Sequence, residues 1–156
     1  MAANPTDRSD TMANAATTLP PAGPSDWGLL FLRASGALLL LWVHGLPKLL
    51  GFSQELRLIE DPLHLGALPT LLLAIFAEVA CPLAILCGTL TRLACVPILV
   101  VLLVSLVVVH PGWSIAEGQF AWLLLIVFTT LLISGPGALA WPLPRLGGQG
   151  ATALLR

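Results

Sequence analysis

The chain has 156 residues, of which 57% are hydrophobic and only 10% are charged, and its formal net charge is −1. So few charged residues cannot coat a folded domain of this size, which excludes a water-soluble globular protein and indicates an integral membrane protein. The balanced charge provides no basic patch for nucleic acid and no bulk attraction to anionic headgroups. The expected surroundings are the lipid bilayer itself.

Four apolar segments divide the chain. Residues 1–26 hold almost no large apolar side chains, so we expect a disordered N-terminal tail. Residues 27–141 hold the four segments, joined by connections too short for another domain, and residues 142–156 form a Gly-rich C-terminal tail. An up-and-down bundle is the simplest closed arrangement of four such neighbours. The predicted fold class is therefore all-α, an integral membrane four-helix antiparallel bundle.

The first span, residues 27–51, carries three ionisable side chains, Arg33, His44 and Lys48, which share one helix face at 100° per residue. Such groups cost about 2.5 to 3.5 kcal/mol each at bilayer depth, so they usually face protein or water and are functional candidates. Pro47 also deprives a carbonyl of its backbone partner. We expect a break in this helix beside His44.

The second span, residues 67–88, carries Glu78 at its middle and Pro82 four residues later. Counted from the same end of the bundle, Arg33 lies about 9 Å and Glu78 about 15 Å deep, a difference that an arginine side chain can bridge. We therefore expect a buried Arg33–Glu78 ion pair. Such a pair either only sets the helix register or also touches a ligand or a proton path.

The connection of residues 52–66 has apolar residues at steps of three and four among charged ones. This pattern is typical of a short amphipathic helix on the membrane surface, with an ordinary solvated loop as the alternative.

Three cysteines, Cys81, Cys87 and Cys95, lie in or beside apolar segments. Their spacing fits neither a disulfide framework nor a metal-binding motif, so we expect small buried side chains and no metal site.

A second polar layer is expected at the opposite end of the bundle. By the same count His44 and Lys48 lie there, together with His110 after the third span and with Glu117 and Gln119 at the start of the fourth. Two histidines from different helices at one depth, with hydrogen-bond donors beside them, predict a ligand pocket, and a set of interfacial residues is the alternative.

The fourth helix is expected to begin at a capping box formed by Ser114 and Glu117 and to end at Gly135-Pro136-Gly137. This pattern favours a capping role for Glu117 over that of a catalytic acid.

Orientation is predicted from the distribution of basic residues. The positive-inside rule favours placing both termini in the cytoplasm, because one side of the bundle carries more of them. That side would hold Arg8, Arg92, Arg145 and Arg156, and the other side Lys48 and Arg57.

Short motifs follow one another in a characteristic order: Leu32-Arg33, His44-Gly45 with Lys48, Ala77-Glu78, the turn Gly88-Thr89-Leu90-Thr91-Arg92, His110, and Gly135-Pro136-Gly137. In this combination, over about residues 27–137, the chain resembles the DoxX family of small bacterial and archaeal four-helix membrane proteins. The resemblance implies an inner-membrane protein associated with oxidoreductase systems, among them a terminal quinol oxidase, a thiosulfate:quinone oxidoreductase and complexes of oxidative-stress defence.

Two departures from the family pattern bear on chemistry. Gln119 stands where many relatives carry a carboxylate, and Ala138-Leu139-Ala140-Trp141 replaces the Ser-Leu-Asp that often follows the Gly-Pro-Gly turn. The sequence also lacks paired histidines for two haems and a Gly-rich nucleotide loop, so no intrinsic cofactor is expected, and a redox cofactor would belong to a partner.

Three classes of function remain open. The first is a quinone-interacting subunit of a membrane oxidoreductase complex, at most a non-autonomous part of an enzyme, with a membrane or soluble redox partner. The second is a non-enzymatic scaffold that recruits a partner, and the third is a small carrier or proton path. A homo-oligomer is compatible with each of them.

Overall fold

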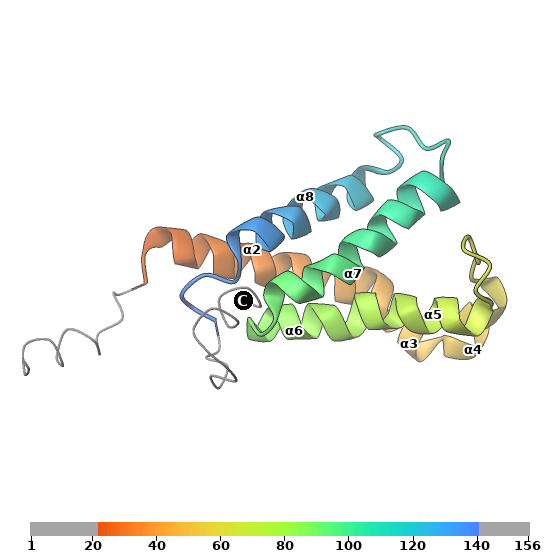
Figure 1. Cartoon of the computed structure of the whole chain (residues 1–156), viewed down its shortest axis with the longest axis horizontal. Helices are drawn as coiled ribbons and strands as arrows, with labels where there is room; N and C mark the ends of the chain where they lie inside the picture. The colour runs from red at the N-terminus through yellow and green to blue at the C-terminus, as the bar shows by residue number, and fades with distance from the viewer. Residues whose placement is uncertain (1–21, 141–156) are drawn as a thin grey trace, which may run out of the picture.

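The computed structural model describes residues 22–140, and every regular element within that range is a helix (Figure 1). Three helical segments, Pro24–Leu50, Ala67–Cys87 and Thr91–Val109, are long and apolar enough to cross a membrane. A fourth apolar helix, α8 (Gln119–Ser134), has 16 residues. Most of the predicted N-terminal tail and the whole C-terminal tail lie outside the described residues. The all-helical, membrane character predicted from composition is confirmed.

Each of the three long segments is continuous but contains one π-helical stretch of five residues. The first consists of α2 (Pro24–Leu40), η1 (Leu41–Gly45) and α3 (Leu46–Leu50). The second consists of α5 (Ala67–Ile75), η2 (Phe76–Ala80) and α6 (Cys81–Cys87). The third consists of α7 (Thr91–Val104) and η3 (Ser105–Val109). The short helix α4 (Phe52–Leu58) follows the first segment, as the amphipathic pattern predicts.

Each π-helical stretch ends shortly before a proline. A proline lacks an N–H, and its ring clashes with the carbonyl four residues earlier, which favours a wider turn with bonds spanning five residues before these three prolines, although α7 shows no such turn before Pro97. The break expected beside His44 is therefore a widened turn within an unbroken helix. In each stretch the closing N–H belongs to the residue just before a proline: Leu46 before Pro47, Cys81 before Pro82, and His110 before Pro111.

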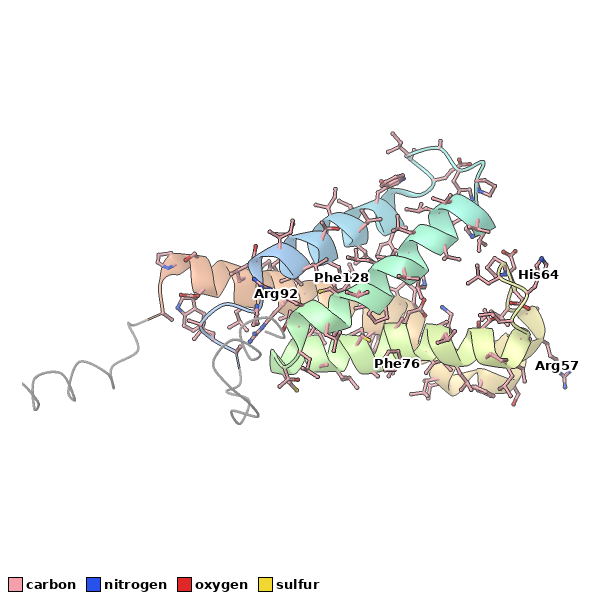
Figure 2. The ribbon with its side chains drawn as sticks, viewed as in Figure 1. Arg57, His64, Phe76, Arg92 and Phe128 are labelled. Atoms are coloured by element: carbon pink, nitrogen blue, oxygen red, sulfur yellow. The ribbon has the colours of Figure 1, made fainter. Side chains whose placement is uncertain are left out.

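The helices converge at one end of the molecule and diverge at the other. In Figure 1, α7 crosses close to α6 and then separates from α5, while α8 runs back along α7 in the opposite direction. The hydrophobic core lies in the half where the helices converge, around Phe128 of α8 (Figure 2). Four helices, α2, α6, α7 and α8, supply its buried members, among them Leu40, Ile85, Ile98 and Leu124.

Large apolar side chains also cover much of the outer surface, including Phe31, Trp42 and Ile126. Continuous apolar surface of this kind is rare on soluble monomers and is the usual lipid-facing surface of a membrane protein. The outer face of the helices is therefore suited to contact with the bilayer.

The first two segments cross most closely at Gly45, where η1 meets η2. A side chain at Gly45 would overlap the backbone carbonyl of Glu78 and press on Val79. Only glycine permits this approach, which brings Lys48, three residues later, next to Glu78.

Replacing Gly45 by alanine should therefore destabilise the protein by about 1 to 3 kcal/mol, because the added methyl forces the two backbones apart. The measurement is thermal unfolding in detergent. Gly28→Ala is the matched control, since no atom lies within 4 Å of the added methyl, and it should be neutral or slightly stabilising. An equal change in unfolding temperature for Gly45→Ala and Gly28→Ala would contradict a close crossing at Gly45.

Candidate functional site

An ion pair joins the first two segments beside this crossing. Lys48 of α3 donates a hydrogen bond from Nζ to Oε2 of Glu78 in η2 at 2.5 Å. Both side chains are largely enclosed, with 19% of Lys48 and 9% of Glu78 exposed. Within residues 22–140 this is the only salt bridge between side chains. Charges so enclosed are retained only when each offsets the desolvation of the other.

The expected Arg33–Glu78 pair is wrong, because the helix ends are not flush. Gly45, not Arg33, lies level with Glu78, whereas the Arg33 guanidinium lies against Gly88 at the end of α6. Ten residues separate Glu78 from Gly88, about 15 Å along the helix. Glu78 therefore belongs to the outer polar layer and not to a separate layer with Arg33.

Arg33 instead holds the chain that follows α8. Its side chain is buried, 2% exposed, and donates to the carbonyl oxygens of Pro136 at 3.1 Å and Leu139 at 2.6 Å. Asp26 accepts a hydrogen bond from the N–H of Ala138 at 2.8 Å. The Gly-Pro-Gly motif is thus the point where the end of the bundle is fastened to α2.

The turn between the second and third segments contributes to the same end. Gly88 ends α6 with φ +72°, a left-handed conformation that favours glycine. Arg92, singled out in this turn, donates to the carbonyl of Ile133 at 3.0 Å and so caps the last turn of α8. These motifs have a structural role here, and their position is remote from the Lys48–Glu78 pair.

A cavity of about 410 Å³ adjoins the ion pair. It brings together four of the five predicted pocket residues, His44, Lys48, His110 and Glu117, and adds Glu78. Gln119 is exposed and does not line the cavity. The remaining lining includes Ser105 of η3, Trp113 of the following loop and the apolar residues Leu40, Val43, Ile98, Leu102 and Phe120.

Both histidines of the cavity pack against aromatic rings. His110 stacks on Trp113 with ring centroids 3.8 Å apart and planes 8° from parallel, and His44 lies 5.4 Å from Phe120. Neither imidazole is hydrogen bonded to another residue in the described part of the chain. The rings are thus held in place while their nitrogens can bond to a ligand.

Glu117 is committed to the capping box. Its Oε2 accepts hydrogen bonds from the Ser114 N–H and hydroxyl, both at 2.7 Å. These bonds lower the pKa of the Glu117 carboxyl, the backbone N–H having the larger effect. The box closes one turn, and α8 itself begins at Gln119, so the fourth helix starts later than expected. An ionised, capped Glu117 forms the rim of the cavity.

A second cavity, about 650 Å³, lies on the other side of the ion pair. It runs between α5–η2 and α7–η3, and the loop after α4 covers one end. Lys48, Glu78, Ser105 and His110 line both cavities. Its other walls are mostly apolar: Leu58, Ile59, Leu63, Leu73, Phe76, Ala77, Val96, Val100 and Val104.

The covering loop, residues 59–66, is organised by Asp61. The carboxylate accepts hydrogen bonds from the N–H groups of Leu65 at 3.0 Å and Gly66 at 2.6 Å and from the Thr70 hydroxyl at 2.8 Å. The Thr70 hydroxyl has the largest effect in lowering the pKa of the Asp61 carboxyl. Figure 2 shows His64 in this loop and Arg57 of α4 at the same end of the molecule, and Arg92 toward the other.

Two of the three cysteines lie where the sequence predicts. Cys81 and Cys95 are buried in the core cluster, whereas Cys87 at the end of α6 is exposed, so the expectation of a buried side chain is wrong for Cys87. Residues 22–140 contain no group of three or more His, Cys, Asp or Glu side chains that could hold a metal ion.

Sequence reasoning missed Ser105 and Trp113 as cavity residues and placed Glu78 in the wrong layer. Ser105 carries a detectable signal, because it is the single hydroxyl in the apolar run of the third segment. Trp113 resembles an ordinary interfacial aromatic residue, and only its stacking on His110 places it at the cavity.

The fold and the site define an all-helical integral membrane protein with an ionisable cluster at one end of its bundle. A family model described as DoxX matches residues 28–111, more than half of the chain, from α2 through η3. The chain belongs to the DoxX family, whose members are membrane proteins often linked to oxidoreductase-associated function. No curated protein and no solved structure matches it.

Removing one partner of the Lys48–Glu78 pair should be costly because it leaves an enclosed charge uncompensated. Glu78→Leu and Lys48→Met should each lower the free energy of unfolding by about 3 kcal/mol, and the double variant should cost less than the sum. Thermal unfolding in detergent measures all three. The control is the double variant Arg33→Met/Glu78→Leu, whose loss of unfolding free energy should equal the sum of the two single losses. The pairing would be contradicted if the losses were non-additive for Arg33 and Glu78 but additive for Lys48 and Glu78.

The Asp61 loop should loosen in acid. Because its pKa is lowered in the folded protein, the ionised carboxylate stabilises the loop above the unfolded value of 3.8, and this stabilisation is lost as pH falls through the lower folded pKa. A nitroxide attached to His64→Cys, with Cys87 replaced by Ser, should become more mobile below that point. Asp61→Asn should show the mobile spectrum already at neutral pH, and an unchanged spectrum would exclude this role for Asp61.

Proposed function

We propose that the protein is an inner-membrane, quinone-interacting subunit of an oxidoreductase complex. The proposal rests on one observation: His44, Lys48, Glu78 and His110 all line the first cavity, which adjoins the larger and mostly apolar second cavity. Membership of the DoxX family supports an association with an oxidoreductase. Another subunit of the complex would be the redox partner.

The proposed arrangement in the membrane is a four-helix antiparallel bundle in which α8 is the fourth span. At 1.5 Å per residue its 16 residues measure about 24 Å, somewhat less than the hydrocarbon thickness. Both termini are placed in the cytoplasm. Arg92 and Arg57 lie toward opposite ends of the molecule (Figure 2), as the charge argument requires, whereas Arg8, Arg145 and Arg156 lie outside the described residues.

The donor set of the cavity fits a quinone head. A quinone accepts two electrons and two protons at its two carbonyl oxygens, so it needs donors where negative charge develops and a nearby group that exchanges protons. Lys48 and His44 can donate hydrogen bonds to one carbonyl. His110, which lines both cavities, is the candidate for the group that exchanges protons.

Two of the residues first considered have smaller roles in this proposal. Gln119 does not line the cavity, and Glu117 is held by Ser114 at its rim. Glu78 takes their place as the enclosed acid, where its carboxylate orients the Lys48 side chain. The electrons would come from a redox partner, so the chain by itself would not be an autonomous enzyme.

The test is retention of quinone during purification from native membranes. Wild-type protein should retain bound quinone, and His44→Ala should lower the retained amount about tenfold, the loss expected for one hydrogen bond to a charged or developing-charge group. Gln119→Ala is the matched control and should retain as much as wild type.

Other results point to the other classes of function. An unchanged set of co-purified proteins with no quinone in any version would favour a scaffold. Proton flux into liposomes by the isolated protein, abolished by Glu78→Gln, would favour a proton path.

A further inference from the structure

The second cavity has features that the proposed head site does not use. It is larger than the first, about 650 against 410 Å³, and lies within the range of cavities that enclose organic ligands, about 300 to 1,000 Å³. Beyond the polar residues that it shares with the first cavity, its walls are aliphatic or aromatic apart from Glu60 and Thr70. The Thr70 hydroxyl is already bonded to Asp61, so most of this surface suits an apolar ligand.

This cavity opens toward the bilayer. Leu73 and Phe76 on one wall and Val96 and Val100 on the other are each about half exposed, 47 to 54%, and in a membrane this exposed surface faces lipid. Phe76 lies on the helix from which α7 diverges (Figure 2). A chain in the hydrocarbon region can therefore enter sideways without crossing the aqueous interface.

The two cavities share a polar wall. Lys48, Glu78, Ser105 and His110 line both of them, so a head bonded to Lys48 in the first cavity lies beside the inner end of the second. A polar cavity joined to a mostly apolar one fits a molecule with a polar head and a long apolar tail. It does not fit a small water-soluble molecule.

We propose that the second cavity binds the long apolar tail of a membrane quinone, which reaches its head site from the bilayer between α5–η2 and α7–η3. This inference rests on the proposed function for the identity of the head. The loop of residues 59–66, which lines this cavity, then covers part of the tail.

The experiment compares two quinones with the same ring, one with a tail of several isoprene units and one with none. Binding is measured to the full chain in phosphatidylcholine nanodiscs, for wild type, Val100→Trp and Ile126→Trp. Val100 lines the second cavity and is 52% exposed, while Ile126 on α8 is 60% exposed and lines neither cavity. Each probe partitions equally into the nanodiscs of all three proteins, so partitioning cancels in the comparison.

Val100→Trp should weaken binding of the long-tailed quinone about tenfold or more, because the indole excludes several methylene groups from the second cavity. It should change binding of the tail-less quinone less than about twofold, and Ile126→Trp should change neither. Equal weakening of both probes by Val100→Trp, or no weakening of either, would overturn the tail site. Leu73→Trp, on the facing wall, repeats the test if Val100→Trp does not purify as a single species.

If wild type binds neither quinone, the proposed function is wrong. A photoreactive long-chain prenyl alcohol without a quinone ring then tests separately whether the second cavity binds an apolar tail. Labelling of residues 58–65 and 96–104 that excess unlabelled alcohol competes away, and that Val100→Trp reduces, supports a tail site for another amphiphile. Labelling of these residues no stronger than that of α8 overturns it.

Discussion

The enclosed ion pair between Lys48 and Glu78 is the interaction on which the arrangement depends. An ammonium and a carboxylate placed separately among apolar helices would each be strongly disfavoured, so their pairing requires the first two segments to meet at one level. Gly45 allows that meeting, because its missing side chain leaves room for the Glu78 carbonyl. The pair thereby sets the register of the two segments and separates a polar cavity from an apolar one.

Three prolines shape the surroundings of this pair. Each widens the helical turn that precedes it, and the widened turns η1, η2 and η3 hold His44, Glu78 and Ser105, three residues of the polar cavity. A π-helical turn places its side chains differently from an α-helical one and often occurs where a helix carries function. Backbone irregularity and polar side chains thus coincide at the end where the helices diverge.

Sequence patterns were sufficient for the membrane class, the segments and most of the polar cluster. Composition determines the class, and helical periodicity places His44 and Lys48 on one face. The predicted Arg33–Glu78 pair is wrong because a depth count along the sequence assumes that the helix ends are flush, whereas α2 begins at Pro24 and Arg33 lies level with the end of α6. Gln119 was assigned to the cavity because sequence spacing does not show where the loop after His110 turns α8. Both errors concern how one helix lies against another, which is decided by packing and not by local sequence.

Arg33 has a consequence for motion in the bundle. Its guanidinium ties Pro136 and Leu139 to α2, and Arg92 ties the end of α8 to α7, so three helices are fastened at the end where the core is packed. At the other end the segments diverge around the two cavities, and Lys48–Glu78 is the one side-chain ion pair that joins them within residues 22–140. Because these hydrogen bonds hold the helices together at the Arg33 end, we expect the bundle to be stiffest there and any displacement of the helices to be largest around Lys48 and His110. The contacts that Arg33 and Arg92 make at one end of the bundle therefore bear on how far apart the helices lie around the two cavities at the other end.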